Sequence, residues 1–116
     1  KIRYVAKNKS YSLFWELFLR LEVSRSLVTS PSFVLLDEPF AGIDPIAVID
    51  IQGVILQLKS KGIGIVISDH NVRETLGVCD RAYIIDQGKI VEFGDPHEIS
   101  NSKKAKERYL GEKFKL

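Results

Sequence analysis

The sequence is poor in the residues that define several classes of protein. It contains one cysteine, Cys79, and no methionine among its 116 residues. A single cysteine cannot form an internal disulfide, which favours a reducing compartment. No apolar run reaches the ~18 residues of a transmembrane helix, and no signal-peptide core follows the first residues. Only 8 Gly and 4 Pro are present, which excludes a low-complexity linker.

The composition and length describe a globular chain that is one domain or a piece of a larger protein. Apolar residues make up 45% and charged residues 28%, which excludes a disordered or collagen-like chain. The net charge is +2, but residues 1–10 and 101–116 are both basic, so residues 11–100 carry a net charge of −6. Basic ends either form an ordinary solvated surface or bind anionic lipid or nucleic acid. The solvated surface is favoured, and we expect no nucleic-acid partner.

The order of apolar runs predicts a strand, a helix and a second strand. Residues 33–36 and 63–67 are continuous apolar runs, as in buried parallel strands. Asp44 followed by Pro45 predicts the start of a helix, because Asp caps the first amides and Pro fits the first helical position. We expect this helix to end at Lys61-Gly62. Its buried face should consist of Val48, Ile51, Ile55 and Leu58.

The second half of the chain continues this alternation. Residues 71–79 form the next expected helix, followed by strands at 81–85 and 89–93 that are joined by a turn at 86–89. Two short helices are expected from Pro96 onward. Two successive strand, helix and strand units predict an α/β fold with a mostly parallel sheet flanked by helices and an antiparallel hairpin at its edge.

Residues 11–29 are also expected to be helical, with an unusual apolar stretch. Seven of the nine residues from Leu13 to Leu21 are apolar, so this helix would be hydrophobic on all sides. Such a helix is either buried in a core or faces a membrane or a partner protein. The buried core is favoured on general grounds.

Residues with catalytic chemistry follow the first two predicted strands. Asp37 and Glu38 end the first strand, and Asp69 and His70 end the second. Ligands of open parallel sheets bind beyond the carboxyl ends of the strands, so these groups should converge on one edge. A carboxylate for Mg²⁺, a base for water and a donor to phosphate are what metal-assisted phosphate chemistry requires. The alternative is that these residues only cap helices and form turns.

Three segments of this region resemble, in order and spacing, the later motifs of the ABC-type ATPases. Leu35-Leu36-Asp37-Glu38-Pro39 resembles the Walker B motif with its catalytic glutamate, and Ala41-Gly42-Ile43-Asp44-Pro45 resembles the D-loop. Ile67-Ser68-Asp69-His70 resembles the segment of the switch histidine. The resemblance implies the C-terminal half of a P-loop NTPase-like fold.

The resemblance also implies a role for each site residue. Asp37 would hold Mg²⁺ through water, Glu38 would orient or deprotonate the attacking water, and His70 would hydrogen-bond the γ-phosphate. Gly42 and Asp44 would also lie at the nucleotide, and Asp44 would couple the two halves of a dimer. The implied cofactors are therefore ATP and Mg²⁺.

Further stretches resemble one branch of this family. Residues 69–76, 79–85 and 109–116 look like the ATPase subunit of the bacterial lipopolysaccharide export transporter. The ATPases of branched-chain amino acid importers are the nearest alternative. The resemblance implies a homodimer with a second ATPase subunit, and transmembrane permease subunits as partners. It implies a cytoplasmic location, peripheral on the inner face of the cytoplasmic membrane.

The same resemblance divides the chain into three regions. Residues 1–30 would be the end of a helical subdomain with a degenerate signature helix. Residues 31–95 would be the α/β core with Walker B, D-loop and switch histidine, and residues 96–116 a C-terminal helical tail.

Two features of the family are missing or altered. No Gly-x-x-x-x-Gly-Lys-Ser/Thr loop occurs, so the amides and lysine that hold the phosphates are absent from this sequence. Where the family signature should read Ser-Gly-Gly-Glu, residues 14–19 intervene before the match resumes at Arg20. We therefore expect a C-terminal portion that cannot bind or hydrolyse ATP alone. If residues 14–19 occupy the signature position, we expect an exposed apolar patch at Phe14, Trp15, Phe18 and Leu19 in place of a buried core.

Three functions are compatible with this sequence. The chain is part of an ATP-hydrolysing transporter subunit, or it is a non-catalytic remnant of one that folds or docks. An independent Mg²⁺-dependent phosphohydrolase or receiver-like domain would use Asp37, Glu38, Asp44 and Asp69. That third function leaves the D-loop match unexplained, so the transporter subunit is favoured.

Overall fold

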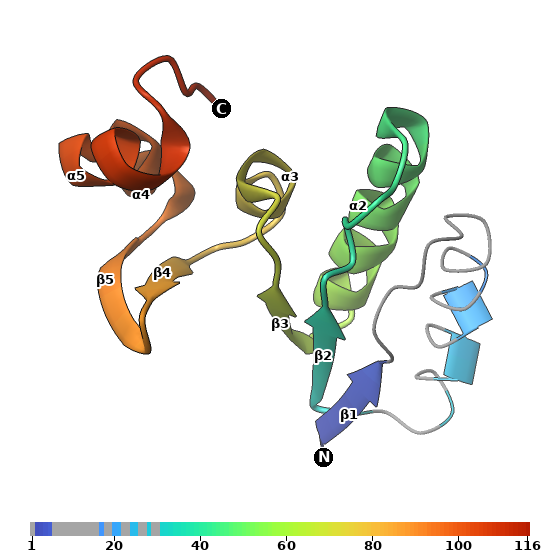
Figure 1. Cartoon of the computed structure of the whole chain (residues 1–116). Coiled ribbons are helices and arrows are strands. Elements are labelled where there is room, and N and C mark those ends of the chain that lie inside the picture. The colour runs from blue at the N-terminus through green and yellow to red at the C-terminus, as the bar shows by residue number, and fades with distance from the viewer. Residues whose placement is uncertain (1, 6–16, 18–19, 22–23, 26–27, 29–30) are drawn as a thin grey trace. The chain divides into compact units, whose positions relative to one another are not determined.

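The computed structural model describes residues 2–5, 17, 20–21, 24–25, 28 and 31–116 (Figure 1). The chain divides into two compact units, Lys1–Glu74 and Thr75–Leu116. Among the described residues, no helix has the length and hydropathy that crossing a bilayer requires.

A three-stranded parallel sheet forms the centre of the first unit. Strands β1 (Ile2–Val5), β2 (Phe33–Asp37) and β3 (Gly64–Ser68) lie in that order, with β2 in the middle. Both strand pairs are parallel, and Asp37 lies opposite Ser68 at the carboxyl ends of β2 and β3. The loops that follow β2 and β3 therefore leave the same edge of the sheet.

Helix α2 (Pro45–Ser60) connects β2 to β3 and buries one of its faces. The carboxylate of the N-cap residue Asp44 accepts hydrogen bonds from the amides of Ile46 and Ala47, and the helix ends at Lys61. The predicted strands, helix and cap are thus confirmed, and only Val48 of the expected buried face is half-buried. The buried residues of β2 and α2 are Val34, Leu36, Ala47, Ile51, Val54, Ile55 and Leu58.

The helix predicted at residues 11–29 is confirmed at every described position within it. Positions 17, 20–21, 24–25 and 28 are helical, and the hydroxyl of Ser24 donates a hydrogen bond to the carbonyl of Arg20 at 3.1 Å. Leu17, Leu21 and Val28 are exposed. The apolar patch predicted at Phe14, Trp15, Phe18 and Leu19 lies outside the described residues.

The second unit is built around an antiparallel hairpin of β4 (Ala82–Asp86) and β5 (Lys89–Gly94). Gln87 and Gly88 form its turn with φ values of 50° and 76°. Two successive positive φ values define a type I′ turn, whose twist matches that of paired strands. The turn and hairpin predicted from the sequence are therefore confirmed.

The strand that the sequence predicts at residues 81–85 is β4, which lies in the second compact unit. There β4 pairs with β5, in a two-stranded sheet. Helix α3 (Val72–Leu76) has five residues and is shorter than the predicted 71–79, and after it the amides of Val78 and Cys79 donate to the carbonyl of Thr75. Pairing β4 with the next strand closes only a two-residue loop, which costs little chain entropy.

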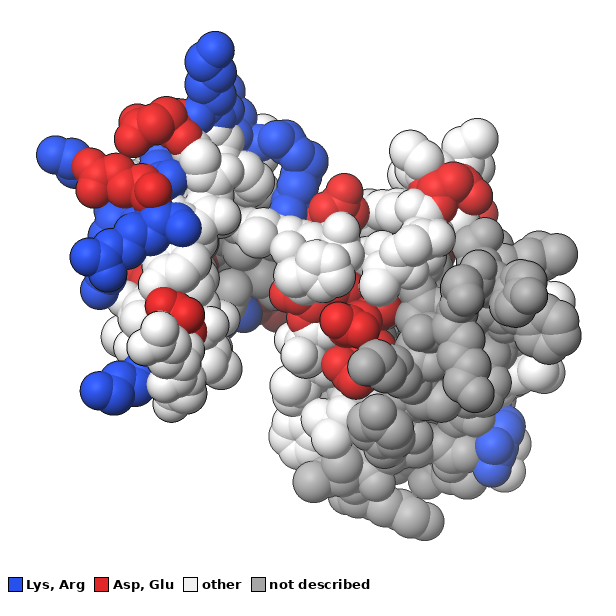
Figure 2. All heavy atoms as spheres, viewed as in Figure 1, with Lys and Arg blue, Asp and Glu red and all other residues white. Residues whose placement is uncertain are grey.

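Short helices complete the second unit, and the structure divides them into three elements where the sequence predicts two. They are α4 (Pro96–Asn101), α5 (Lys103–Ala105) and a π-helical turn η1 (Lys106–Leu110). Asp95 and Glu98 form a capping box at the start of α4. Figure 2 shows Lys and Arg side chains over these C-terminal helices, with acidic side chains among them.

Two polar contacts join the hairpin to the C-terminal helices. The hydroxyl of Ser102 donates to the carboxylate of Glu92 at 2.8 Å, and the hydroxyl of Tyr109 donates to Asp86 at 3.1 Å. The bond from Ser102 lowers the pKa of Glu92, whereas burial and the bond to Asp86 raise the pKa of Tyr109. Because the pKa of folded Glu92 is lowered, the stability that this contact contributes is lost as the pH falls through that pKa.

Replacing Ile51 by alanine tests the packing of α2. Ile51 is fully buried, so Ile51→Ala should lower the free energy of unfolding by about 2–5 kcal/mol in urea titrations followed by circular dichroism. Ile49→Ala on the same helix is the matched control, because the side chain of Ile49 is 68% exposed. This substitution should change the free energy of unfolding by no more than about 0.5 kcal/mol. Equal losses for the two variants would contradict the assigned core.

Candidate active site at the carboxyl ends of β2 and β3

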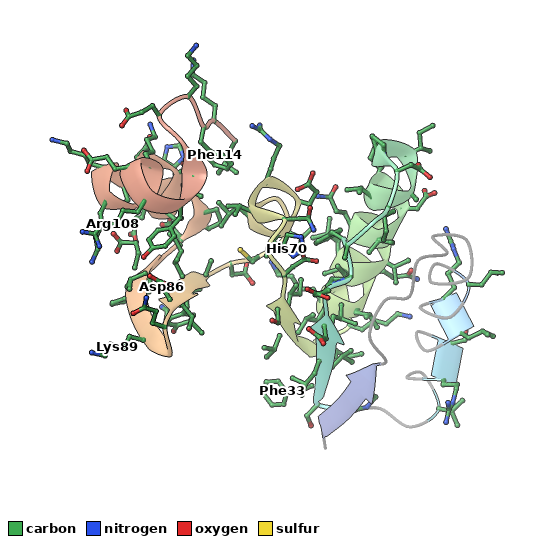
Figure 3. The ribbon with its side chains drawn as sticks, viewed as in Figure 1. Phe33, His70, Asp86, Lys89, Arg108 and Phe114 are labelled. Carbon is green, nitrogen blue, oxygen red and sulfur yellow. The ribbon has the colours of Figure 1, made fainter. Side chains whose placement is uncertain are left out.

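The two residues predicted to be catalytic meet where β2 and β3 end. Glu38 follows β2 and His70 lies two residues beyond β3. The amide of Glu38 donates to the carbonyl of Ser68 at 2.6 Å, which extends the pairing of the two strands by one residue. Nδ1 of His70 then lies 3.6 Å from Oε1 of Glu38. Figure 3 shows His70 at the point where the chain leaves β3 towards α3.

Both side chains of this pair remain accessible to a ligand. The side chain of His70 is 73% exposed and that of Glu38 is 34% exposed. A carboxylate and an imidazole 3.6 Å apart can bind a water and an anion side by side. The pair can therefore serve as a base for water and a donor to an oxyanion.

Glu38 has a backbone conformation that side-chain-bearing residues rarely adopt. Its φ is +51°, in the left-handed region. A tight turn follows, in which the amide of Ala41 donates to the carbonyl of Glu38 at 3.3 Å, and both Pro39 and Phe40 are buried. Such strain persists only where the surrounding structure fixes it, and it is common at functional sites.

Asp69 is a half-buried residue of this edge that the predicted set of ATPase residues did not include. Its side chain has no exposed surface. Oδ2 accepts a hydrogen bond from the amide of Phe40 at 2.8 Å, and Oδ1 accepts from the amide and the side-chain amide of Asn71 at 2.8 and 2.7 Å. The spacing Asp-x-Asn after a strand is typical of a turn in which Asp binds the amide two residues on, and this signal could have identified it.

Gly42 and Asp44 belong to the loop that begins α2. Gly42 has a φ of +65°, which favours glycine there. The carboxylate of Asp44 accepts from the amides of Ile46 and Ala47 at 3.0 and 2.9 Å, so one of its oxygens caps α2. The contacts of Gly42 and Asp44 with a nucleotide stay predictions.

Asp37, the last residue of β2, is the residue predicted to hold Mg²⁺. Within the part of the chain that the structure describes, no group of three or more His, Cys, Asp or Glu side chains could hold a metal ion. Mg²⁺ at nucleotides takes only one or two protein carboxylates and completes its shell with water and phosphate oxygens. A half-buried carboxylate at a strand end fits that mode of binding and does not fit a cage made by protein alone.

Comparisons with curated proteins give relatives along most of the chain, although no family model matches it. The lipopolysaccharide export system ATP-binding protein LptB of Haemophilus influenzae is 55% identical over 97 residues, 84% of this chain and 40% of the relative. A probable ABC transporter ATP-binding protein of Azorhizobium caulinodans is 53% identical over the whole chain and 41% of its own length. The chain is homologous to the ABC transporter ATP-binding proteins. It spans about two fifths of the length of these relatives.

Solved structures of ABC ATP-binding cassettes are also similar to the chain. An ATP-binding cassette of an ABC transporter in its ADP conformation matches with a TM-score of 0.68 and 32% identity, over 84% of this chain and 40% of the cassette. A nucleotide-free cassette matches with a TM-score of 0.68 and 33% identity over the same shares. The predicted α/β fold of the P-loop NTPase type is therefore confirmed.

The backbone strain at Glu38 can be measured on the chain itself. Glu38→Gly and Glu38→Ala both remove the side chain, but only glycine accepts a φ of +51° without steric cost. Glu38→Gly should therefore unfold in urea with a free energy about 1 kcal/mol higher than that of Glu38→Ala. If alanine proves equally stable, the left-handed conformation of Glu38 is wrong.

Proposed function

We propose that these residues are the C-terminal part of an ATPase subunit that couples ATP binding and hydrolysis to lipopolysaccharide export. The observation that carries the proposal is the approach of Glu38 and His70 to 3.6 Å at the carboxyl edge of a parallel sheet. The export ATPases are favoured over the branched-chain amino acid importers because the relatives of Haemophilus influenzae and Acidithiobacillus ferridurans, 55% and 51% identical, are both named LptB.

In the proposed reaction each residue of the edge acts on a different atom. The partly exposed carboxylate of Glu38 orients a water molecule and accepts its proton as the oxygen attacks the γ-phosphorus. The bond from this phosphorus to the oxygen that bridges it to the β-phosphate breaks, and ADP leaves with that oxygen. The ring of His70, which is largely exposed, donates a hydrogen bond to a γ-phosphate oxygen. Asp37 would hold Mg²⁺ through water, and the bound ion would supply positive charge at the phosphates.

The proposal also includes the subunits with which the ATPase would assemble. The subunit would work as a homodimer with a second ATPase subunit, in which Gly42 and Asp44 lie at the nucleotide and Asp44 couples the two halves. Permease subunits that span the membrane would be its partners, on the inner face of the cytoplasmic membrane. The regions 1–30, 31–95 and 96–116 would be the end of a helical subdomain, the α/β core and a helical tail.

A non-catalytic remnant is the second candidate function. It is favoured by the six residues, 14–19, that stand where the signature should lie. The remnant and the ATPase differ in one property, which is whether the edge residues can hydrolyse ATP once the missing loop is supplied.

The chain alone should not bind ATP with useful affinity. Asp37 and His70 would contact only the ion and one phosphate, and the phosphate-binding loop does not occur in this sequence. Isothermal titration calorimetry with Mg-ATP should therefore show no binding heat. A dissociation constant near or below about 10 µM, equivalent to about −7 kcal/mol, would contradict this expectation.

A chimera tests the catalytic assignment. In it, residues 31–116 replace the matching part of the Haemophilus influenzae relative, which supplies the remaining length. Glu38→Gln should leave Mg-ATP binding intact and slow hydrolysis by roughly 10²–10⁴, the range of general base catalysis. Asp37→Asn should instead weaken binding that depends on Mg²⁺.

The matched control for the chimera is Glu112→Gln, the same change at an exposed residue of the C-terminal segment. It should hydrolyse ATP at the rate of the unsubstituted chimera. Full activity in Glu38→Gln would show that another group is the base. An inactive unsubstituted chimera would favour the remnant.

A further inference from the structure

One buried carboxylate of the edge has no part in the reaction proposed above. The side chain of Asp69 is fully buried, whereas those of Glu38 and His70 are partly or largely exposed. Oδ1 of Asp69 lies 3.9 Å from Nδ1 of His70. A buried charge is costly unless hydrogen bonds satisfy it, so a buried carboxylate beside two reactive groups requires an explanation.

The hydrogen bonds of Asp69 explain how its charge is accommodated. Three N–H groups donate to it at 2.7–2.8 Å, one from Phe40 and two from Asn71. Distances this short are typical of charge-assisted bonds, which are about twice as strong as neutral ones. The two carboxylate oxygens bind different loops: Oδ2 accepts from the loop after β2, and Oδ1 accepts from the loop after β3.

We propose that Asp69 is a positioning residue that sets the approach of Glu38 to His70. This inference rests on the proposed function, because it assigns Asp69 to the same reaction without contact to substrate. Glu38 is held on one side by the bond of its amide to Ser68 and on the other by the bond from Phe40 to Asp69. His70 lies between Asp69 and Asn71, which are bonded to each other. A single carboxylate thus fixes the backbone on both sides of the pair.

The link that Asp69 makes between the two loops depends on the charge of its side chain as well as on its shape. Asparagine has almost the same shape, but it offers one acceptor oxygen and one NH₂ group. Its NH₂ group would face an N–H donor from Phe40 or from Asn71, so one of the two loops would lose its bond. Glutamate keeps both acceptor oxygens on a longer side chain and should restore part of the link.

The first experiment measures the hydrogen bonds by which Asp69 joins the two loops. It uses the chain itself and does not depend on ATP. Amide hydrogen exchange followed by NMR should be at least tenfold faster at Phe40 or Asn71 in Asp69→Asn than in the unsubstituted chain, with a smaller increase in Asp69→Glu. Asp50→Asn is the matched control, because Asp50 is exposed on α2, and its exchange rates at these amides should be unchanged. Unchanged exchange at both amides in Asp69→Asn would overturn the proposal.

The second experiment separates positioning from general stability in the chimera with the Haemophilus influenzae relative. Asp69→Asn should lower kcat for ATP hydrolysis at least tenfold while the dissociation constant for Mg-ATP changes less than threefold, and Asp69→Glu should recover part of kcat. Asp95→Ala, which removes the capping box of α4, is the stability control and should keep kcat. Either an unchanged kcat in Asp69→Asn or an equal loss in Asp95→Ala would overturn the proposal.

The two experiments keep the inference distinct from the function on which it rests. If the unsubstituted chimera does not hydrolyse ATP, the proposed function is wrong, and the exchange rates at Phe40 and Asn71 still decide whether Asp69 links the loops. If the chimera is active and Asp69→Asn is equally active, the function stands and the positioning role is wrong.

Discussion

The parallel pairing of β2 with β3 is the constraint on which the candidate site depends. Asp37 lies opposite Ser68, and the amide of Glu38 continues the pairing to the carbonyl of Ser68. Because side chains alternate along a strand, a shift of one residue would turn Glu38 to the other face and separate it from His70. The register is in turn held by burial, since Val34 and Leu36 are on the covered face of β2 and almost fully buried. Core packing and the geometry of the candidate site are therefore set by the same alignment.

Features set by neighbouring residues could be predicted from the sequence. The cap at Asp44, the helix from Pro45 and the turn at residues 86–89 all follow from local hydrogen bonds or local φ preferences, and the structure confirms each. The convergence of Glu38 and His70 also followed, because parallel strands that end in polar residues must present them at one edge.

Features set by distant residues could not be predicted in the same way. The four residues of β1 were not recognised as a strand, because so short a segment depends on its partner β2 for stability. The length of the second helix was also missed, since α3 ends at Leu76 and not at the predicted Cys79. The role of Asp69 depends on Phe40, 29 residues away, so only the fold could show that this carboxylate binds both loops.

The most direct test of this account is a crystal structure of the chimera with Mg²⁺ and a non-hydrolysable ATP analogue. The account predicts that the γ-phosphate lies at the carboxyl ends of β2 and β3, with the ring of His70 within about 3.5 Å of a γ-phosphate oxygen and Glu38 facing the γ-phosphorus from the side of the attacking water. A nucleotide whose γ-phosphate lies away from Glu38 and His70, with Asp37 still opposite Ser68, would contradict it.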